Sequence, residues 1–406
     1  METYDVIIVG SGHAGAHAAQ QLRQGGYDGS IIMVGRESSL PYERPPLSKD
    51  FMSGRKLPED IQLKSAGFWR ERQIELCQGS PVTTIDPVRK SVTLESGIML
   101  AYGSLIWAAG GEPRGLSCPG AELARVHTLR ALRDADGIKE GLVSADHITL
   151  VGGGYIGLEL AASLRSVGKA VTLIEKQSRL LARATGPELA DFLAKQHRTR
   201  GVDLRLGVDV QMIKDIGSDA LNISLSDGND VHTQMIVAGI GITPSIGPLV
   251  AAGAAAEDGV IVDAFCRTSL ADIFAIGDCA AHPNPFAEGL SIRLESVQNA
   301  HDQAATVASA LCGVSAPYET VPRFWSSQYD LRLQTFGLWH RHDARVVRGD
   351  PEAGPFSIFY LLDGRIVAVD GINAVRDAMQ IKRLVEARAM ADPAMIADIK
   401  VPLTDL

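Results

Sequence analysis

The sequence predicts an α/β fold with two parallel-sheet domains and a smaller α+β domain at its C-terminal end. A strand, glycine turn and helix pattern beginning at Val6 returns with the same glycine spacing 142 residues later, and the chain changes character after residue 320. The 406 residues exceed the length at which one hydrophobic core usually stops growing. The 41 glycines and 21% charged residues suit many strand-to-helix turns, so we expect two or three domains.

The first glycine turn follows the apolar strand Val6 to Val9 and precedes a helix-forming run. It holds three glycines in G-x-G-x-x-G spacing, Gly10, Gly12 and Gly15. The first allows a tight turn, the second lets the backbone approach a pyrophosphate, and the third lets the helix pack close to the sheet. Unpaired N–H groups at the helix N-terminus attract the same anion. We interpret this segment as a Rossmann-type dinucleotide-binding turn.

The same pattern returns at His147, with the three glycines Gly152, Gly154 and Gly157. The strand that follows each copy ends near an acidic residue suited to a ribose hydroxyl, and these residues are Glu37 and Glu175. One such hexapeptide is a weak signal. Two copies, each in the order strand, turn, helix, strand and acid, predict that the chain holds two dinucleotides.

Glu175 also indicates which nucleotide the second copy prefers. A carboxylate hydrogen-bonds a free ribose 2′-hydroxyl and repels a 2′-phosphate, so the sequence favours NADH over NADPH. Lys176 and Arg179 lie close by in the sequence and limit the strength of this preference.

A proline-rich stretch from Pro41 to Lys49 follows the first copy. Proline fixes φ and biases the residue before it toward extended backbone, so we expect a rigid loop and not a helix. The loop is either a plain connection or a frame that holds Tyr42, Glu43, Arg44 and Lys49 beside the first nucleotide.

Short strands and turns connect these units. Gly110 and Gly111 follow the strand Leu105 to Ala108 and mark a crossing point between domains. Asp278 ends a short apolar strand, where parallel sheets bind ligands, so it is either a ribityl ligand or a turn former. The other predicted elements are strands at 92–94, 221–225, 231–233, 235–237, 331–336, 356–361 and 366–369, and helices at 297–312 and about 374–388.

Composition excludes several classes of protein. The net charge of -9 argues against a nucleic-acid binder. No apolar run reaches the ~20 residues of a membrane span and no signal peptide is evident, so we expect a soluble cytoplasmic protein without membrane contact. The five cysteines form no C-x-x-C pair, so we expect no metal site and no redox pair. Residues 321–406 hold 11 Lys+Arg and 11 Asp+Glu, which makes this part comparatively basic.

The order of seven motifs resembles the FAD-dependent ferredoxin reductases of bacterial oxygenase systems. These motifs are VGSGHAG, LPYERPPLSK, VGGGYIGLE, AGIGITP, TSLADIFAIGDCA, SIRLESVQNA and FWSSQY, and they span essentially the full chain. The resemblance implies a glutathione-reductase-like fold. It places an FAD-binding domain at 1–108 and 238–320, an NAD-binding domain at 109–237 and a C-terminal α+β domain at 321–406.

The resemblance also implies the site residues. FAD would be bound by Gly10, Gly12, His13, Ala14, Gly15, Arg36, Glu37, Arg44, Lys49, Val82, Ala109, Gly110, Arg130, Asp278, Val297 and Trp325. NADH would be bound by Gly152, Gly154, Tyr155, Ile156, Gly157, Glu159, Glu175 and Gly241. The ferredoxin would dock near Trp325 through the basic residues Arg293, Lys382 and Arg383.

Lys49, Glu159 and Tyr155 are the catalytic candidates that the resemblance implies. A cation near the flavin would stabilise the charge of the reduced ring, and a carboxylate could position the nicotinamide carboxamide. Lys49 and Glu159 could equally form a purely structural ion pair.

Three positions depart from the family pattern. Glu37 stands one residue beyond the expected acid, so either Arg36 or Glu37 contacts the FAD ribose. Ala109 replaces a hydroxyl residue, and Ser327 replaces an aspartate.

The expected function is an NADH:ferredoxin oxidoreductase that passes electrons from NADH through FAD to a two-iron two-sulfur ferredoxin, which feeds a cytochrome P450 or a ring-hydroxylating dioxygenase. We expect a monomer or weak homodimer. One alternative is an NADH oxidase or disulfide-reductase-like flavoenzyme, but a redox cysteine is absent from residues 41–49 and Cys77 lies well downstream. Another is an interaction protein resembling apoptosis-inducing factor, whose nucleic-acid binding the net charge of -9 disfavours.

Overall fold

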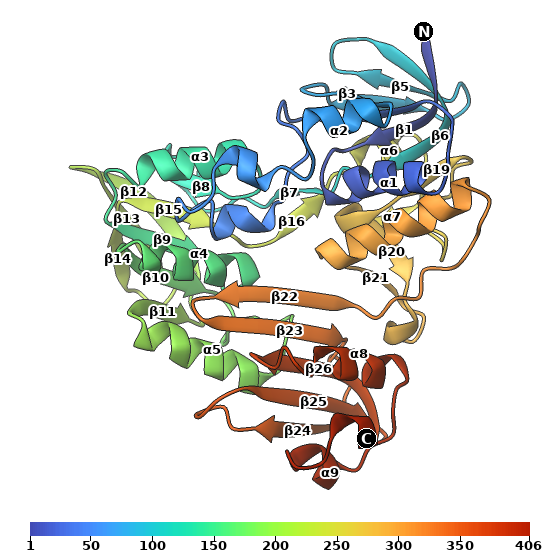
Figure 1. The fold of residues 1–406 in the computed structure, drawn as a ribbon. Helices are drawn as coiled ribbons and strands as arrows, with labels where there is room; N and C mark the ends of the chain where they lie inside the picture. The colour runs from blue at the N-terminus through green and yellow to red at the C-terminus, as the bar shows by residue number, and fades with distance from the viewer. The chain divides into compact units, whose positions relative to one another are not determined.

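Both glycine turns follow a central parallel strand in the computed structural model, which describes residues 1–406. Figure 1 labels the helices and strands along the chain. The chain divides into two units, which we call the first and the second unit. The first comprises Met1–Arg44, Ile61–Glu112 and Thr243–Phe324, and the second comprises Pro45–Asp60, Pro113–Ile242 and Trp325–Leu406. The predicted three-domain division, with its boundaries near residues 108, 238 and 321, stays a prediction.

The first unit is built on a seven-stranded sheet in the order β3-β2-β1-β6-β5-β4, with β19 paired to β6. Strands β1, β2, β3, β6 and β19 are parallel, and β4 and β5 extend the sheet antiparallel. The strands are β1 Glu2–Val9, β2 Ile31–Val34, β3 Ile74–Cys77, β4 Val82–Asp86, β5 Ser91–Leu94, β6 Met99–Trp107 and β19 Ile273–Ala275.

Helices and a second small sheet complete the first unit. The helices are α1 His13–Gln24, α2 Ala66–Glu71, α6 Gly247–Ala251 and α7 Val297–Leu311. The small sheet joins β17 Ala256–Glu257, β18 Gly259–Ile261, β20 Ala280–Pro283 and β21 Ser291–Arg293. The short strands β7 Gly111–Pro113 and β16 Ile242–Pro244 lie where the chain passes between the units.

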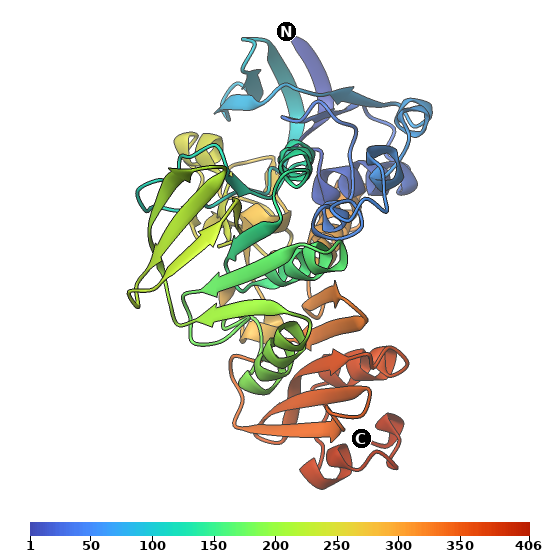
Figure 2. The same cartoon turned by 90° about the vertical axis from the view of Figure 1, so that its left-hand side faces the viewer.

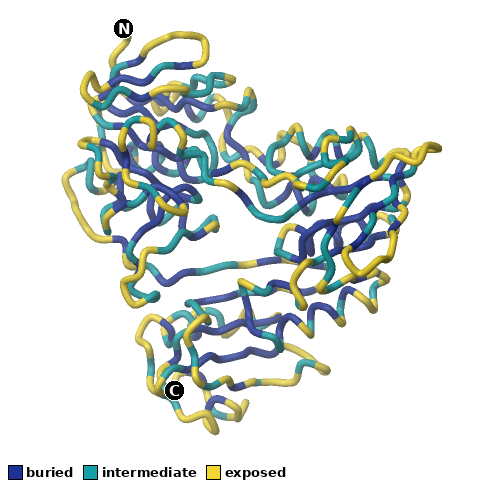
Figure 3. The backbone as a smooth tube through the Cα atoms, turned by 180° about the vertical axis from the view of Figure 1, so that it is seen from behind, coloured by how far each residue is buried: buried dark blue, intermediate teal, exposed yellow.

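Successive side chains of β1 enter two different hydrophobic cores. Val6 and Ile8 pack with α1 and α7, whereas Ile7 and Val9 pack with residues of β4, β5 and β18 on the opposite face. Because the strand is buried on both faces, it reads as a continuous apolar run in the sequence. The buried strands appear as dark blue segments in Figure 3.

The second unit contains a parallel five-stranded sheet in the order β11-β10-β9-β15-β8. Its strands are β8 Val126–Thr128, β9 His147–Val151, β10 Ala170–Glu175, β11 Val202–Leu206 and β15 Met235–Ala238. Its helices are α3 Leu132–Gly141, α4 Tyr155–Ser166 and α5 Pro187–Thr199. A three-stranded antiparallel sheet adds β12 Val210–Gly217, β13 Ala220–Leu225 and β14 Asp230–Thr233.

A second five-stranded sheet, drawn in orange and red in Figure 2, forms the C-terminal part of this unit. Its order is β22-β23-β26-β25-β24, and α8 packs on β23 and β26. The elements are β22 Arg323–Gln328, β23 Leu331–Gly337, β24 Ala344–Gly349, β25 Phe356–Leu362, β26 Arg365–Ile372, α8 Ala378–Glu386 and α9 Pro393–Ala397.

The structure corrects two expectations about local structure. Pro45–Ser48 forms a 3₁₀ turn, closed by the Lys49 N–H donating to the Pro46 carbonyl, so the prediction that this stretch contains no helix was wrong. Proline φ values suit such a turn as well as an extended loop. The last helix, α8, is shorter than the predicted 374–388, because Asn373 has φ of 55° and Ala374 to Asp377 form a turn.

Candidate functional site

The first glycine turn leaves no room for side chains at its two key positions. Gly10 has φ of 109°, and a Cβ atom there would lie 2.3 Å from the Ala108 carbonyl oxygen. A Cβ atom on Gly15 would lie 1.9 Å from the Gly10 carbonyl oxygen. The turn and helix α1 therefore have the close backbone packing that a dinucleotide-binding turn requires.

The N-terminus of α1 suits an anion. Its N-cap is Gly12, which provides no side-chain hydrogen bond, and the first turn holds no acidic residue. The free end of the helix dipole would favour a pyrophosphate. These features fit FAD at the position that the sequence predicted.

Two further predicted FAD residues lie at the same end of α1. A Cβ atom on Gly277 would contact the Ala14 Cβ at 3.1 Å, so the turn carrying Asp278 lies against the first turn of the helix. Helix α7 runs parallel to α1, since the rings of His13 and His301 lie 5.9 Å apart near the starts of both helices and Cys312 contacts α1 near its other end. Val297, the first residue of α7, is therefore at this end too.

Glu37 lies within a polar cluster beside the turn. Its carboxylate accepts hydrogen bonds from the Tyr42 hydroxyl at 2.5 Å and from Arg44 Nη2 at 2.6 Å. Burial lowers the pKa of Arg44, but the interactions with Tyr42, Glu37 and Asp278 outweigh burial and raise it overall. Arg36 instead pairs with Glu112 at 2.5 Å, and both side chains are half exposed. This geometry favours Glu37 over Arg36 as the ribose ligand.

The remaining predicted FAD residues are divided between the units. Ala109 and Gly110 follow β6 in the first unit, where Val82 is the first residue of β4. Lys49, Arg130 and Trp325 belong to the second unit. The contacts of these residues with FAD stay predictions.

The second glycine turn repeats the geometry of the first. Gly152 has φ of 115°, and a Cβ atom there would lie 2.4 Å from the Gly239 carbonyl oxygen. A Cβ atom on Gly157 would lie 2.0 Å from the Gly152 carbonyl oxygen. The N-cap of α4 is Gly154, again without a side-chain cap or an acidic residue in the first turn. This turn also fits a pyrophosphate.

The acid at the end of β10 faces the second turn. Glu175 Oε2 accepts a hydrogen bond from the Gly153 N–H at 2.5 Å, and Oε1 accepts one from the Gln177 N–H at 2.7 Å. The two nearby cations are engaged elsewhere. Lys176 pairs with Asp209 at 2.8 Å, and the guanidinium of Arg179 donates to the backbone carbonyls of Ala182 and Thr185. The structure thus strengthens the preference for NADH over NADPH.

Two other predicted NADH residues lie on the same unit. Ile156 lies in the first turn of α4 and is exposed. Gly241 has φ of 111°, and a Cβ atom added there would have Arg183 Nη2 as its nearest neighbour, at 3.8 Å. Gly241 is therefore an open position where a ligand could approach the backbone.

Lys49 and Glu159, two of the catalytic candidates, form an ion pair, and their catalytic roles stay a prediction. Glu159 on α4 is 5% exposed, and its Oε2 accepts from Lys49 Nζ at 2.5 Å and from the Ser48 hydroxyl at 2.7 Å. Its other oxygen, Oε1, accepts from the Ser326 hydroxyl at 2.7 Å. Three donors therefore hold this carboxylate from two segments that are far apart in the sequence.

Tyr155 is held next to a buried acid. Its pKa is raised above the ordinary value, first by burial and then by the charge of Asp370, although a hydrogen bond with Thr335 lowers it. Asp370 is buried and accepts from the hydroxyls of Thr185, Thr335 and Tyr360. Burial raises the pKa of Asp370, against the lowering effect of these three donors.

The basic residues expected to dock a ferredoxin differ in their surroundings. The side chain of Arg293 is only 7% exposed and pairs with Asp258 at 3.2 Å and with Glu295 at 2.7 Å. This geometry weighs against a direct contact with a partner and indicates that Arg293 braces the small sheet. Lys382 pairs with Glu386 at 3.1 Å on α8, and Arg383 on the same helix is exposed.

None of the five cysteines forms a disulfide in the structure, and the cysteine beside Asp278 is poorly suited to redox chemistry. All five are free, and no group of His, Cys, Asp and Glu residues could hold a metal ion. Cys279, next to Asp278, is fully buried, and burial raises its pKa to about 12. A thiol with so high a pKa is not a nucleophile at neutral pH.

None of the helices is long and apolar enough to cross a membrane.

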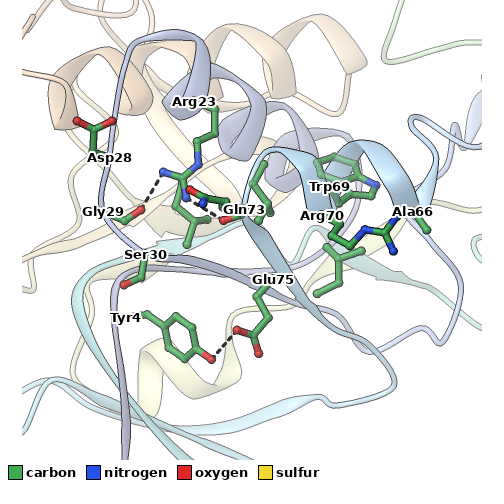
Figure 4. Close-up of a pocket in the computed structure, with 13 residues that line it drawn as sticks. Tyr4, Arg23, Asp28, Gly29, Ser30, Ala66, Trp69, Arg70, Gln73 and Glu75 are labelled. Carbon is green, nitrogen blue, oxygen red and sulfur yellow. Dashed lines mark hydrogen bonds between the residues drawn. The ribbon is translucent and has the colours of Figure 1, made fainter.

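Figure 4 shows a pocket in the first unit, and none of the residues that line it belongs to the glycine turn. It is lined by residues near the amino ends of β1, β2 and β3, such as Tyr4, Ser30 and Ile74. The Tyr4 hydroxyl donates to Glu75, and Arg23 donates to the carbonyls of Tyr27 and Gly29. Parallel sheets bind nucleotides at their carboxyl ends, so this pocket is not the dinucleotide site.

Comparison with known families and proteins gives full-length matches. The family described as pyridine nucleotide-disulphide oxidoreductase matches residues 4–304, and the one described as reductase C-terminal matches residues 323–406. A 5,5′-dehydrodivanillate O-demethylase ferredoxin reductase subunit from Sphingobium sp. is 48% identical over 407 residues, covering 100% of this chain and 99% of the relative.

Two solved structures are similar over nearly all of both chains. The ferredoxin reductase for the CYP199A2 system from Rhodopseudomonas palustris has a TM-score of 0.95 at 34% identity, covering 100% of this chain and 99% of that one. The reductase in a covalent putidaredoxin reductase–putidaredoxin complex has a TM-score of 0.94 at 34% identity, covering 100% and 97%.

Proposed function

The chain belongs to the pyridine nucleotide-disulphide oxidoreductase family, with a reductase C-terminal domain, and from this premise we propose how its residues serve an FAD-dependent ferredoxin reductase. The enzyme passes electrons from NADH through FAD to a small iron-sulfur ferredoxin of an oxygenase system. The ferredoxin that we propose carries a two-iron two-sulfur cluster. We further propose that the enzyme acts as a monomer or weak homodimer, and its cytoplasmic location stays a prediction.

The observation that carries the assignment of sites is the presence of one uncapped glycine turn in each unit. The first turn would hold FAD, with Glu37, Arg44 and Asp278 beside it. The second would hold NADH, with Glu175 beside it. When bound, FAD accepts a hydride from NADH and releases its electrons one at a time.

Lys49 and Glu159 would orient the reacting groups. The carboxylate of Glu159, fixed by three donors, would position the nicotinamide carboxamide and hold the ammonium of Lys49 toward the flavin. Tyr155, on the first turn of the same helix, would cover the nicotinamide. The alternative of a purely structural ion pair is tested by the substitution of Glu159 described in the Discussion.

Replacing Glu175 by alanine is expected to raise the KM for NADH about tenfold and to leave the FAD spectrum unchanged. The change removes the carboxylate that accepts a hydrogen bond from Gly153 and would hold the ribose hydroxyls. Loss of a hydrogen bond to a charged group lowers binding affinity about tenfold or more. Steady-state kinetics with ferricyanide as acceptor measure the effect.

Lys176→Ala is the matched control for this experiment, because Lys176 is exposed and its partner, Asp209, lies outside the turn. It should leave the KM for NADH unchanged. Loss of flavin from Glu175→Ala, with NADH binding intact, would show that the two turns are assigned the wrong way round.

We propose that the ferredoxin docks on the C-terminal sheet of the second unit. Trp325 on the edge strand β22 is 39% exposed, and α8, which packs on the same sheet, presents Lys382 and the exposed Arg383. A basic helix would attract an acidic partner through a small interface that weakens with salt. Arg293, which lies in the first unit and whose side chain is only 7% exposed, is not part of this proposal.

Replacing Arg383 by glutamate is expected to raise the KM for the ferredoxin about tenfold or more. The substitution turns a positive side chain into a negative one, which would repel an acidic partner across the interface. Turnover of NADH with ferricyanide should not change. Arg198→Glu makes the same charge reversal at an exposed position of α5 and should leave the ferredoxin KM as it is. Equal effects of both substitutions would show that only net charge matters and that α8 is not the docking helix.

The alternative functions are not favoured. A thiol-based oxidase or disulfide reductase needs a reactive cysteine, and Cys279 and Cys266 are buried with raised pKa values. A nucleic-acid-binding interaction protein is disfavoured by the net charge of -9.

A further inference from the structure

A continuous chain of hydrogen bonds leads away from Glu159 through the second unit. The Ser326 hydroxyl donates to Glu159 Oε1 at 2.7 Å, and Gln328 Nε2 donates to the Ser326 oxygen at 3.1 Å. Gln328 Oε1 then lies 2.9 Å from His197 Nε2, and His197 Nδ1 lies 3.2 Å from the Tyr329 hydroxyl. The chain joins α4, β22 and α5 and ends at Tyr329, over which the guanidinium of Arg200 stacks.

All the internal members of this chain are buried. Ser326 is 1% exposed, Gln328 is 2% exposed and His197 is 0% exposed. Buried polar side chains are costly unless their hydrogen bonds are made, and hydrophobic residues of similar size would fill these positions at lower cost. The strand β22 therefore turns its polar residues inward and exposes Trp325 and Ser327.

The carboxylate at one end fixes the direction of every hydrogen bond in the chain. An ionised carboxylate can only accept, so the single hydroxyl proton of Ser326 must point at Glu159. The Ser326 oxygen must then accept from the amide NH₂ of Gln328, and this turns the Gln328 carbonyl oxygen toward His197. His197 must therefore carry its proton on Nε2 and accept from the Tyr329 hydroxyl on Nδ1.

The environment of His197 keeps the ring neutral. Burial lowers its pKa and Arg200 lowers it further, while the hydrogen bond with Gln328 opposes both. A neutral ring has one donor and one acceptor nitrogen, as the chain requires.

We propose that Ser326, Gln328 and His197 are positioning residues for hydride transfer, which act through Glu159. They lock Oε1 of the carboxylate so that Oε2 keeps its bonds to Lys49 and Ser48. The proposal rests on the proposed function of Glu159 and assigns roles to three residues outside the predicted site.

Ser326→Ala tests the first link, with Ser327→Ala as its matched control on the exposed face of the same strand. Ser326→Ala should lower the rate of flavin reduction by NADH about tenfold, in line with the loss of one hydrogen bond to a charged group, and leave the dissociation constant for NAD⁺ nearly unchanged. Ser327→Ala should change neither quantity. Equal rates for the two variants, both with full FAD content, would overturn the proposal.

Gln328→Glu tests the direction of the chain without changing its volume. Once ionised, a carboxylate at this position can only accept, so it competes with Glu159 for the one hydroxyl proton of Ser326; because burial favours the protonated form, which can still donate, the rate is compared at alkaline pH. The rate of flavin reduction should fall about as far as in Ser326→Ala. A rate equal to that of the unmodified enzyme would contradict the direction that we infer.

The tautomer of His197 gives a test that does not depend on activity. In protein with ¹⁵N-labelled histidine, the His197 ring should show a protonated Nε2 and an unprotonated Nδ1 at neutral pH, with the signal assigned by its loss in His197→Leu. His197→Gln, which can still donate an N–H toward Gln328, should restore most of the hydride-transfer rate that His197→Leu loses. An Nδ1-protonated ring, or equal rates in the two variants, would overturn the proposal.

Glu159→Gln separates failure of this proposal from failure of the proposed function. If Glu159→Gln slows flavin reduction and Ser326→Ala does not, only the positioning chain is wrong. If Glu159→Gln itself has no effect, the role of Glu159 and the chain that depends on it are both wrong.

Discussion

Replacing Gly10 by alanine should remove FAD from the protein, whereas replacing Gly152 by alanine should remove NADH binding and leave FAD in place. Gly10 and Gly152 have φ of 109° and 115°, which L side chains rarely adopt. A Cβ atom would also lie 2.3 Å from the Ala108 carbonyl oxygen in the first case and 2.4 Å from the Gly239 carbonyl oxygen in the second. Since neither backbone oxygen can move without opening the turn, we expect losses in affinity of about 10²-fold or more.

The flavin spectrum of the purified protein measures FAD content, and titration of the flavin with NADH without dioxygen measures nucleotide binding. Gly137→Ala is the matched control, because Gly137 lies within α3 and a Cβ atom there meets nothing within 4 Å. This variant should bind both nucleotides and melt no lower than the unmodified protein, since alanine favours a helix over glycine. A Gly152→Ala protein without flavin, or a Gly10→Ala protein with a full flavin complement, would contradict the assignment of the two turns.

Replacing Glu159 by glutamine should lower the rate of flavin reduction by NADH about 10²-fold, the usual effect of removing one preorganised group at a reaction centre. Both oxygens of the carboxylate accept hydrogen bonds, from Lys49 and Ser48 on one and from Ser326 on the other. Glutamine keeps the shape but must turn its NH₂ group toward one of these donors, and it leaves the ammonium of Lys49 without its negative partner. The Lys49 side chain would then lose its fixed position.

Stopped-flow absorbance of the flavin separates this chemical step from turnover with an electron acceptor. Glu140→Gln, an exposed position on α3 in the same unit, is the control and should reduce at the normal rate. An unchanged rate for Glu159→Gln, with FAD content and melting temperature also unchanged, would show that the ion pair of Lys49 and Glu159 has no role in hydride transfer.

The two nucleotide turns could be predicted because the chemistry that they serve is local. Gly10 and Gly15, and their counterparts at Gly152 and Gly157, are each required by backbone geometry within one turn, whereas Gly12 and Gly154 leave the first turn of each helix without a side-chain cap. Glu37 and Glu175 could also be predicted from local sequence, because each lies at or just after the end of the strand that follows its turn. The apolar run Val6 to Val9 indicated a strand, and it lies within β1, where the structure buries it on both faces.

The strand β22 could not be predicted from the same kind of pattern. In an ordinary half-buried strand the apolar residues point inward, but here Ser326 and Gln328 are buried while Trp325 is exposed. A strand whose buried residues are polar and whose exposed residue is apolar does not show the hydrophobic periodicity by which strands are predicted. Such a conflict between local pattern and fold is expected where a strand serves a site, and Ser326 contacts Glu159 from 167 positions away.

Contacts with residues distant in the sequence also explain why the surroundings of Arg293 do not favour the predicted docking role. Its basic side chain and its place in a recognised motif predicted a docking role, but the structure surrounds it with Asp258 and Glu295. Glu295, two positions along the chain, was a visible signal. Asp258, 35 positions away, was not, and together they leave Arg293 little freedom to meet a partner.

The measurement that tests the central claim most directly is a two-step titration without dioxygen. One equivalent of NADH should bleach the bound flavin, and an oxidised two-iron two-sulfur ferredoxin should then restore the absorbance at two ferredoxins per flavin. A flavin that NADH reduces but that only dioxygen or a disulfide reoxidises would contradict the account, because the electrons would then leave by another route.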